Sequence, residues 1–283
     1  MRRPNEKLRV IDHYNRVSPY YRKLWGEHLH HGYWIRGDES KEIAQVQLVE
    51  HLAEAAAIPF HLVVLDVGCG FGGSSIYLAR ERKAQVTGIS ISPLQVQMAR
   101  EAADRAGVAA SFFCMDAEAM SFDRRFDVVW SIESISHYQD VPHFFASAAK
   151  LLHPGGVIAI TDWFKRKSAP ARKHERLFRK IEDGMLVKLH TMQDYQSYLA
   201  AVGMKVTRTE VLNKYCAKTW DFCLDIIKER SLWDLAASNG AEFIRFLRAF
   251  KAMRAGFSSG DFVYGLIVAR KSDQGRADLT YGR

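Results

Sequence analysis

An acidic residue followed by three evenly spaced glycines is the most chemically informative feature of this sequence. Residues 63–65 are apolar, Asp66 follows them, and the next seven residues include Gly68, Cys69, Gly70 and Gly72. Glycine lets a backbone lie against a ligand that a Cβ atom would push away. The helix expected after this turn presents free N–H groups and the positive end of its dipole. The segment therefore predicts a ligand-binding loop between a buried strand and a helix.

The spacing within this loop separates two kinds of cofactor. A phosphate-binding Rossmann loop has the spacing G-x-G-x-x-G, whereas the segment from Asp66 to Gly72 reads D-x-G-x-G-x-G. A carboxylate at the strand end repels phosphate but suits a cation or a hydroxyl group. We therefore expect S-adenosylmethionine (SAM), whose amino-acid part carries an ammonium group, rather than NAD. A generic tight turn is the alternative.

Polar residues after the next two strands suit the nucleoside part of such a cofactor. Ser90, Ser92 and Gln95 can hydrogen-bond a ribose, although no carboxylate stands among them. Ser92 precedes Pro93, so it can also cap the next helix, and the two roles are compatible. Asp116 follows the third strand, where it can accept from an adenine amino group or cap a helix.

Two groups able to carry a proton follow the fourth predicted strand. Glu133 and His137 are four residues apart, which places them on one face if the segment is helical. Beside the expected cofactor, such a pair can remove a proton as a methyl group arrives. The same residues can instead form structural hydrogen bonds at a helix start, and the sequence leaves both interpretations open.

Three histidines invite a metal interpretation: His28, His30 and His31, between Trp25 and Trp34. Glycines at positions 26 and 32 break the segment, so no helical pair of histidines at i and i+4 is evident. We therefore expect no metal site. A loop that closes over the cofactor is the interpretation we prefer.

Strands and helices alternate through residue 162. The predicted strands are seven apolar runs: residues 62–67, 85–90, 110–115, 126–132, 157–162, 204–211 and 261–269. The predicted helices lie before, between and after them: residues 39–57, 73–82, 93–106, 141–152, 164–190, 193–202 and 214–256. This order predicts an α/β fold, a Rossmann-like, seven-stranded, mostly parallel sheet with helices on both faces.

The helices after the fifth and sixth strands are predicted to form a lid. They interrupt the sheet and can fold over the carboxyl ends of its strands, where open α/β sheets bind ligands. We expect N-terminal helices with a cofactor-closing segment in residues 1–60 and a SAM-binding core in residues 61–163. A helical lid and substrate region, with the last two strands, is expected in residues 164–270, and a flexible tail in residues 271–283.

Composition narrows the choice of partners and location. The 283 residues are 48% hydrophobic and 25% charged, as in ordinary soluble globular proteins. A net charge of +8 would suit nucleic acid, but the basic residues are scattered and fit solvated helix faces better. The four cysteines form no C-x-x-C pair, which suggests neither a zinc site nor a disulfide framework and fits a reduced, cytoplasmic location. We expect no signal peptide and no membrane span.

Together these residues resemble those of the class I SAM-dependent methyltransferases. More closely, the chain resembles the branch of γ-tocopherol C-methyltransferases and related small-molecule, sterol and cyclopropane-type enzymes. The most specific match is the segment from Trp25 to Trp34, supported by residues 65–72, 88–95 and 152–156 and by Glu133 with His137. The likeness covers residues 10–165. The branch commonly has Thr-Leu-Ser-Pro where this chain has Ser-Ile-Ser-Pro at residues 90–93, and the lid gives no comparable match.

The resemblance implies a role for each matched residue. Tyr33 and Trp34 would close over the methionine part of SAM, with Asp66 beneath it, and Glu133 and His137 would face the acceptor. The implied cofactor contacts are Tyr33, Trp34, Asp66, Gly68, Cys69, Gly70, Gly72, Ser90, Ile91, Gln95, Asp116, Ala117 and Ser131.

The predicted function is methyl transfer from SAM to a small, largely apolar acceptor, such as a prenylated, aromatic or isoprenoid natural product. The family likeness slightly favours a carbon atom as the acceptor atom. N- or O-methylation of a small metabolite is the alternative. A nucleic-acid methyltransferase, a dinucleotide oxidoreductase and a non-catalytic SAM-binding protein are rivals from other classes, and a homo-oligomer is an open option.

Overall fold

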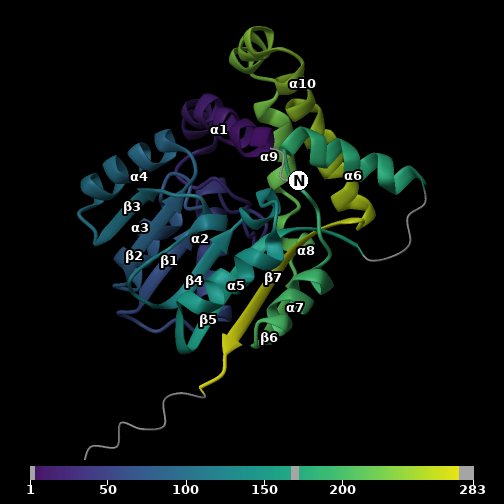
Figure 1. Cartoon of the computed structure of the whole chain (residues 1–283). Helices are drawn as coiled ribbons and strands as arrows, with labels where there is room; N and C mark the ends of the chain where they lie inside the picture. The colour runs from purple at the N-terminus through teal and green to yellow at the C-terminus, as the bar shows by residue number, and fades with distance from the viewer. Residues whose placement is uncertain (1–3, 167–171, 274–283) are drawn as a thin grey trace, which may run out of the picture.

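The computed structural model describes residues 4–166 and 172–273, and its centre is a seven-stranded sheet (Figure 1). The strands in chain order are β1 (Val63–Val67), β2 (Gln85–Ser90), β3 (Ala110–Cys114), β4 (Phe126–Ile132), β5 (Leu152–Lys165), β6 (Met204–Val211) and β7 (Phe262–Lys271). Their spatial order is β3-β2-β1-β4-β5-β7-β6. Neighbours among β1 to β5 are parallel, and β7 runs antiparallel to both β5 and β6. The predicted seven-stranded, mostly parallel sheet is therefore confirmed.

Helices cover both faces of this sheet, as predicted. They are, in chain order, α1 (Pro4–Trp25), α2 (Lys41–Ala55), α3 (Gly73–Glu81), α4 (Pro93–Ala106), α5 (Val141–Leu151), α6 (Arg172–Met185), α7 (Met192–Ala201), α8 (Asn213–Cys216), α9 (Thr219–Ile226) and α10 (Arg230–Ser259), with two short 3₁₀ helices, η1 (Ala117–Ala119) and η2 (Ile135–His137). Side chains alternate across each strand. Val64 accordingly packs in the buried cluster that includes α2 and α3, whereas Leu65 packs in the cluster that includes α5 and α7.

The fifth strand is longer than predicted, at both ends. Its pairing with β4 shifts register between Phe126–Leu152 and Val128–Val157, so the turn-like residues 153–156 form an irregularity inside the strand rather than a loop before it. At the other end β5 continues to Lys165 because it pairs with β7 over its whole second half. The helix expected from residue 164 therefore begins only at Arg172, in α6.

The helices α6 and α8 to α10 follow β5 and β6, as the lid prediction requires. Figure 1 shows α1, α6, α9 and α10 gathered at one end of the sheet, opposite the arrowhead of β7. Because β7 is antiparallel to its neighbour β5, that end carries the carboxyl ends of the parallel strands. α10 packs along α6, and α1 packs on α4. The N-terminal helix thus joins the lid, which the sequence did not indicate.

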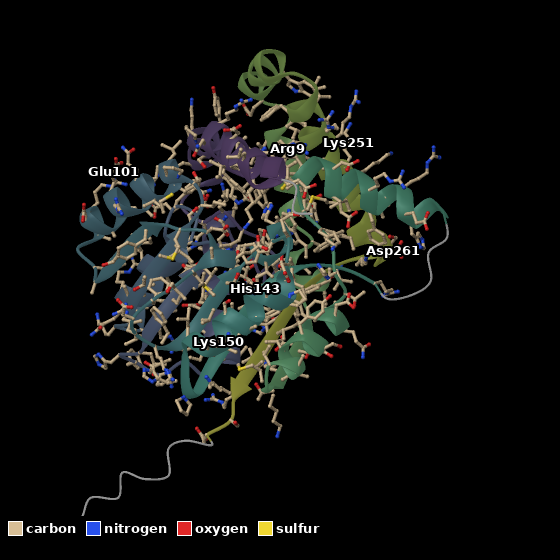
Figure 2. All side chains as sticks on the ribbon, viewed as in Figure 1. Arg9, Glu101, His143, Lys150, Lys251 and Asp261 are labelled. Carbon is tan, nitrogen blue, oxygen red and sulfur yellow. The ribbon has the colours of Figure 1, made fainter. Side chains whose placement is uncertain are left out.

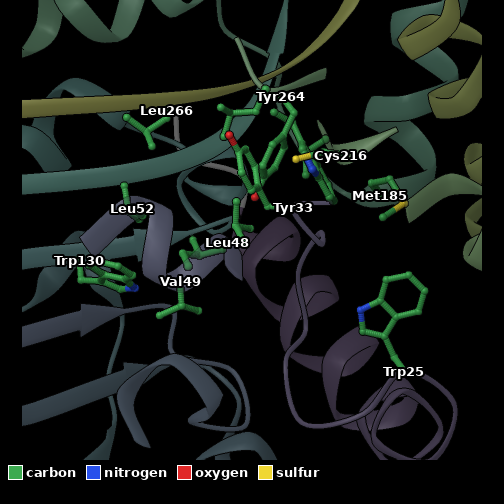
Figure 3. Close-up of a cluster of buried hydrophobic side chains, with 14 of the residues drawn as sticks. Trp25, Tyr33, Leu48, Val49, Leu52, Trp130, Met185, Cys216, Tyr264 and Leu266 are labelled. Atoms are coloured by element: carbon green, nitrogen blue, oxygen red, sulfur yellow. The ribbon is translucent and has the colours of Figure 1, made fainter. Parts of the chain in front are cut away.

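One buried cluster joins this helical region to the sheet. It contains Trp25 from α1, Leu48 from α2, Trp130 from β4, Met185 from α6 and Tyr264 from β7 (Figure 3). Figure 2 labels charged side chains on the outer helices, among them the exposed Glu101 of α4 and Lys251 of α10. Among the described residues no helix is long and apolar enough to cross a membrane. The tail predicted from residue 271 lies, from residue 274 onward, outside the described residues.

The glycine loop between β1 and α3 has the geometry that its sequence suggests. Gly68, Gly70 and Gly72 all have positive φ, at 76°, 53° and 81°. In this left-handed region a side chain is disfavoured. A Cβ atom on Gly68 would also overlap the side chain of Ser134, which follows β4. The loop therefore requires glycine at position 68 for two separate reasons.

We expect Gly68→Ala to destabilise the fold more than Gly107→Ala. Gly107 at the end of α4 also has positive φ, 61°, but a Cβ there would meet no atom within 4 Å. The control should therefore cost about 1–2 kcal/mol for the backbone conformation alone, and Gly68→Ala about 1–3 kcal/mol more from the overlap. Urea unfolding measures both values. Equal losses would show that Ser134 imposes no steric requirement.

Candidate active site

A cavity, here called the polar cavity, lies at the carboxyl ends of the central strands. Its walls include eleven of the predicted site residues: Asp66, Gly68, Cys69, Gly70, Ser90, Ile91, Gln95, Asp116, Ala117, Glu133 and His137. These residues come from the ends of β1, β2, β3 and β4 and from the turns that follow them. The parallel sheet brings them together because all four strands end at the same edge.

Tyr33 and Trp34 do not reach this cavity, contrary to the role implied for them. Tyr33 is buried and packs against the rings of His51 and Tyr215, with centroid distances of 4.4 and 4.6 Å. Trp34 is also buried, and its indole N–H donates to the Glu39 carbonyl oxygen at 3.0 Å. The two aromatic rings are part of the packing of this segment. Leu29 and His30, slightly earlier in the same segment, line the cavity instead.

Gly72 and Ser131 lie just behind the cavity wall rather than on it. Gly72 is the N-cap residue of α3, and a Cβ on it would meet Phe112 and Ala99. The hydroxyl of Ser131 is 2.8 Å from that of Ser134, which also donates to the carbonyl oxygen of Val67 at 2.9 Å. Both residues therefore support the glycine loop without lining the cavity.

Helix α1 supplies cavity residues that the sequence reasoning missed. Lys7 pairs with Asp116 at 2.5 Å and with Glu118 at 2.8 Å, and Tyr14 lies 2.9 Å from the ring of His137. All of these side chains line the polar cavity. No motif marks Lys7 or Tyr14, because their role depends on where α1 lies relative to the sheet. The ion pairs and the hydrogen bond hold α1 across the cavity.

Asp66 is a buried carboxylate on the wall of the polar cavity. It is only 3% exposed, and its Oδ2 atom accepts a hydrogen bond from the Ser75 hydroxyl at 2.6 Å. Burial raises the pKa of Asp66 to about 7, although the bond from Ser75 acts in the opposite direction. A cationic ligand group beside Asp66 would offset the cost of burying its charge. The residue thus suits a ligand that carries an ammonium group.

The polar residues at the ends of β2 and β3 have partly structural roles. Ser92 caps α4 by accepting from the Gln95 N–H at 3.2 Å, which confirms the predicted cap, and it donates to Asn15 of α1 at 2.6 Å. Ser90 donates to the side-chain oxygen of Gln95 at 2.7 Å, and both line the cavity. Asp116 caps η1 through the Glu118 N–H. It therefore combines the capping role with a place on the cavity wall.

Glu133 and His137 are not on one face of an α-helix, so that expectation is wrong. β4 ends at Ile132, Glu133 takes a left-handed conformation with φ of 53°, and the short helix η2 begins only at Ile135. The two residues still lie on the wall of the same cavity. Each has its own set of hydrogen-bond partners, because the turn at Glu133 sends the two side chains to different neighbours.

One oxygen of Glu133, Oε1, accepts three hydrogen bonds. The donors are the backbone N–H of His31 at 2.7 Å, the Nδ1 atom of His31 at 3.0 Å and the hydroxyl of Tyr264 at 2.7 Å. Burial by itself would raise the pKa of Glu133, but the interaction with His31, whose ring and backbone N–H groups both donate to this carboxylate, outweighs burial and holds that pKa below its usual value. Glu133 is therefore an ionised, firmly oriented carboxylate.

His137 is a neutral residue bonded at both ring nitrogens. Its Nδ1 atom is 3.0 Å from the Leu186 carbonyl oxygen, which can only accept, so Nδ1 carries the hydrogen. Nε2 then accepts from the hydroxyl of Tyr14. Burial lowers the pKa of His137 to about 4, which keeps the ring uncharged at neutral pH. His137 thus orients the Tyr14 hydroxyl at the cavity.

A second cavity, here called the aromatic cavity, adjoins the first. Most of its wall comes from the lid helices, and it is dominated by aromatic side chains: Tyr14, Tyr20, Tyr21, Trp25, Trp163, Trp220, Phe243, Phe246 and Phe250. Four residues line both cavities: Tyr14, Leu29, His30 and Glu133. The two cavities therefore meet at one place, where Glu133 and the Tyr14 hydroxyl lie. Several of these aromatic side chains belong both to the buried core and to the cavity wall.

Comparison with known proteins assigns the family. A family model described as "Methyltransferase domain" matches residues 64–156. The 27-O-demethylrifamycin SV methyltransferase of Amycolatopsis mediterranei is 33% identical over 277 residues, which cover 95% of this chain and 98% of that protein. This chain belongs to the class I SAM-dependent methyltransferases. A probable chloroplastic tocopherol O-methyltransferase of Oryza sativa subsp. japonica is 30% identical to this methyltransferase, over 95% of this chain and 80% of that protein.

The solved structures agree with this methyltransferase fold. The structure of a mycolic acid cyclopropane synthase, complexed with SAH and CTAB, matches with a TM-score of 0.85 and 19% identity, over 95% of this chain and 99% of that one. The cofactor of the methyltransferase is SAM, as the glycine loop predicted. The buried carboxylate of Asp66 and the open backbone of the glycine loop fit a ligand that combines an ammonium group with a bulky nucleoside.

We expect SAM affinity to fall as the pH drops through about 7. The ionised form of Asp66 would pair with the ammonium group, and a pKa of about 7 means that protonation removes the carboxylate charge in that range. Below that pKa the dissociation constant should rise by up to about tenfold per pH unit, while an α-amino group with pKa of about 7.7–8.0 stays charged. Calorimetric titration with SAM measures this dependence.

Asp66→Asn provides the control for this pH dependence. The amide keeps a similar shape but does not titrate, so the variant should bind SAM more weakly than the native protein at neutral pH and with little change as the pH is lowered. A variant that keeps the full pH dependence would assign it to another group.

Proposed function

We propose that this methyltransferase transfers the methyl group of SAM to a hydroxyl oxygen of a small, largely apolar acceptor held in the aromatic cavity. One observation carries the proposal: the two cavities share the walls formed by Tyr14, Leu29, His30 and Glu133. A donor in the polar cavity and an acceptor in the aromatic cavity would therefore meet at that junction.

The polar cavity is proposed to hold SAM, which supplies a methyl group activated by its sulfonium charge. Asp66 would pair with the ammonium group, and the backbone from Gly68 to Gly70 would lie along the amino-acid part. Ser90 and Gln95 would bind the ribose, and Asp116 the adenine. Lys7 already pairs with Asp116, so one of the two Asp116 oxygens would be shared between the cofactor and α1.

The aromatic cavity is proposed to hold the acceptor and to keep water away from it. Its lining is mostly aromatic and aliphatic, so an acceptor gains roughly 25 cal/mol for each Å² of apolar surface that it buries. Holding donor and acceptor in line can lower the barrier by about 7–11 kcal/mol. In this proposal residues 61–163 form the SAM-binding core, and residues 1–60 and 164–270 supply most of the acceptor site.

Oxygen is the acceptor atom that the closer comparisons favour. Both full-length relatives described above are named for methyl transfer that involves an oxygen atom, and the family likeness behind the expectation of carbon is less specific. A hydroxyl acceptor must lose a proton when it is methylated. Glu133 and His137, the predicted catalytic residues, lie beside the junction, so the site holds groups that can orient or receive that proton.

The direct test is to incubate the protein with SAM and a panel of apolar phenols, aliphatic alcohols, prenylated hydroquinones, indoles and amines. We expect hydroxylated members to gain one methyl group, detected by product mass, with SAH formed in equal amount. Nuclear magnetic resonance of the product then locates the methyl group. A methyl group on carbon or nitrogen would replace oxygen in the proposal, and SAM binding without any methylated product would contradict it.

Ile226→Glu tests the assignment of the aromatic cavity. Ile226 is half-buried on α9 and lines this cavity but not the polar one. A carboxylate there disfavours an apolar ligand, so the KM for the acceptor should rise by roughly tenfold, about 1.4 kcal/mol. The affinity for SAM should stay unchanged. Ile43→Glu, on an exposed position of α2, is the matched control and should change neither value.

A further inference from the structure

Three buried nitrogen atoms around the aromatic cavity have no hydrogen-bond partner within the described part of the chain. They are Nε2 of His31 and the indole nitrogens of Trp163 and Trp220, and all three residues line this cavity. A buried polar group without a partner costs about 1–3 kcal/mol. Such groups are rare in folded proteins and often mark a ligand or a catalytic role. Other unpartnered buried atoms lie elsewhere in the described residues, but these three belong to residues that line one cavity, which suits polar groups on the acceptor.

The hydrogen bond to Glu133 decides which nitrogen of His31 is free. Glu133 is ionised, so its oxygen can only accept, and in the neutral imidazole the hydrogen must therefore lie on Nδ1, 3.0 Å away. Nε2 then carries an unused lone pair. The backbone N–H of His31 donates to the same oxygen, and the ring stacks on Tyr264 at 4.4 Å between centroids. The imidazole is thus held in one orientation.

The other two histidines near the junction, His30 and His137, have a partner at both ring nitrogens. His30 is bonded at Nδ1 to the carbonyl oxygen of His31 and at Nε2 to the ring of His28. His137 is bonded to Leu186 and Tyr14, as described above. Only His31 among these three combines an oriented ring with a free nitrogen. It is also 2% exposed, so bulk water has little access to it.

The two indole groups lie next to this imidazole. The ring centroid of His31 is 4.9 Å from that of Trp220 and 6.1 Å from that of Trp163. An indole N–H can only donate a hydrogen bond. The residues that line this mostly apolar cavity therefore carry, among their unpartnered nitrogen atoms, one that can accept a proton and two that can donate a hydrogen bond. This set complements a hydroxyl group together with another oxygen that accepts hydrogen bonds.

We propose that His31 is a catalytic residue that accepts the proton of the acceptor hydroxyl, with Glu133 as its positioning residue. Trp163 and Trp220 would bind a further oxygen, so the substrate class is a phenol or enol that carries a second oxygen on an apolar skeleton. This inference rests on the proposed function and adds the proton acceptor and the substrate class to it.

The proposed step balances without another reactant. The hydroxyl oxygen forms a bond to the methyl carbon, while the bond between that carbon and sulfur breaks and its electron pair passes to sulfur, which loses its positive charge. The hydroxyl proton moves to Nε2 of His31. The resulting imidazolium is stabilised by the Glu133 carboxylate that already holds Nδ1, in the manner of other carboxylate–histidine pairs.

The first test uses binding of 4-nitrophenol to the protein loaded with SAH, so that no turnover is needed. Phenol and phenolate forms of this probe absorb at different wavelengths, and its nitro group supplies the further oxygen. We expect the native protein to bind it as phenolate. His31→Asn keeps a side-chain N–H near the position of Nδ1 but cannot take up a proton, so it should bind the neutral phenol.

The second test measures methyl transfer to the best acceptor of the panel. His31→Asn should reduce kcat by roughly 10²–10⁴-fold, the usual contribution of a general base, with SAH affinity within about twofold of native. Glu133→Gln should also lose the phenolate signal, which a purely structural role would not affect. His143→Asn, exposed on α5 (Figure 2), is the matched control and should behave as native.

The outcomes separate this inference from the proposed function. If native protein binds 4-nitrophenol as the neutral phenol, or if His31→Asn keeps the phenolate signal and the native rate, the inference is overturned. If His31→Asn fails to bind SAH, His31→Gln is measured in its place by the same criteria. Absence of any methylated product with a retained phenolate signal would overturn the proposed function while supporting the role of His31 as proton acceptor.

Discussion

The hydrogen-bonded carboxylate of Glu133 is the interaction on which the geometry of the site depends. One oxygen joins the segment around His31, the end of β4 and Tyr264 of β7, which are far apart in the sequence. Residue 133 adopts a left-handed backbone conformation that costs of order 1–3 kcal/mol for such residues. The surrounding bonds hold it there, and they also keep the buried carboxylate ionised. Without them the wall between the two cavities would lose its order.

The two cavities are built by different kinds of structure, and this division suits the reaction. The polar cavity, where the methyl donor is proposed to bind, lies on strand ends and tight turns whose positions follow from the sheet. The aromatic cavity is formed largely by α1, α6, α9 and α10. Helices that pack through apolar contacts can change their side chains without disturbing the sheet. One fold can thus keep its cofactor and accept different substrates.

The sequence predicts an element correctly where neighbouring residues decide its bounds, and it fails where residues far away along the chain decide them. β2, β4, β6 and α4 have the predicted bounds because their signals are local, such as the Ser-Pro start and glycine end of α4. The extension of β5 was missed because it depends on pairing with β7, a hundred residues later. The helical relation expected between Glu133 and His137 failed for a similar reason. The backbone at residue 133 is decided by partners outside its own segment.

The sequence by itself determined the fold class, the cofactor and eleven residues of the polar cavity, because the glycine loop and the strand ends carry their chemistry in consecutive residues. Tertiary structure alone decided that Tyr33 and Trp34 pack away from the cavity and that Lys7 and Tyr14 reach it. It also decided that Nε2 of His31, a residue of the aromatic cavity, has no hydrogen-bond partner within the described part of the chain. These features arise where segments distant along the chain meet, and spacing within one segment holds no information about such contacts.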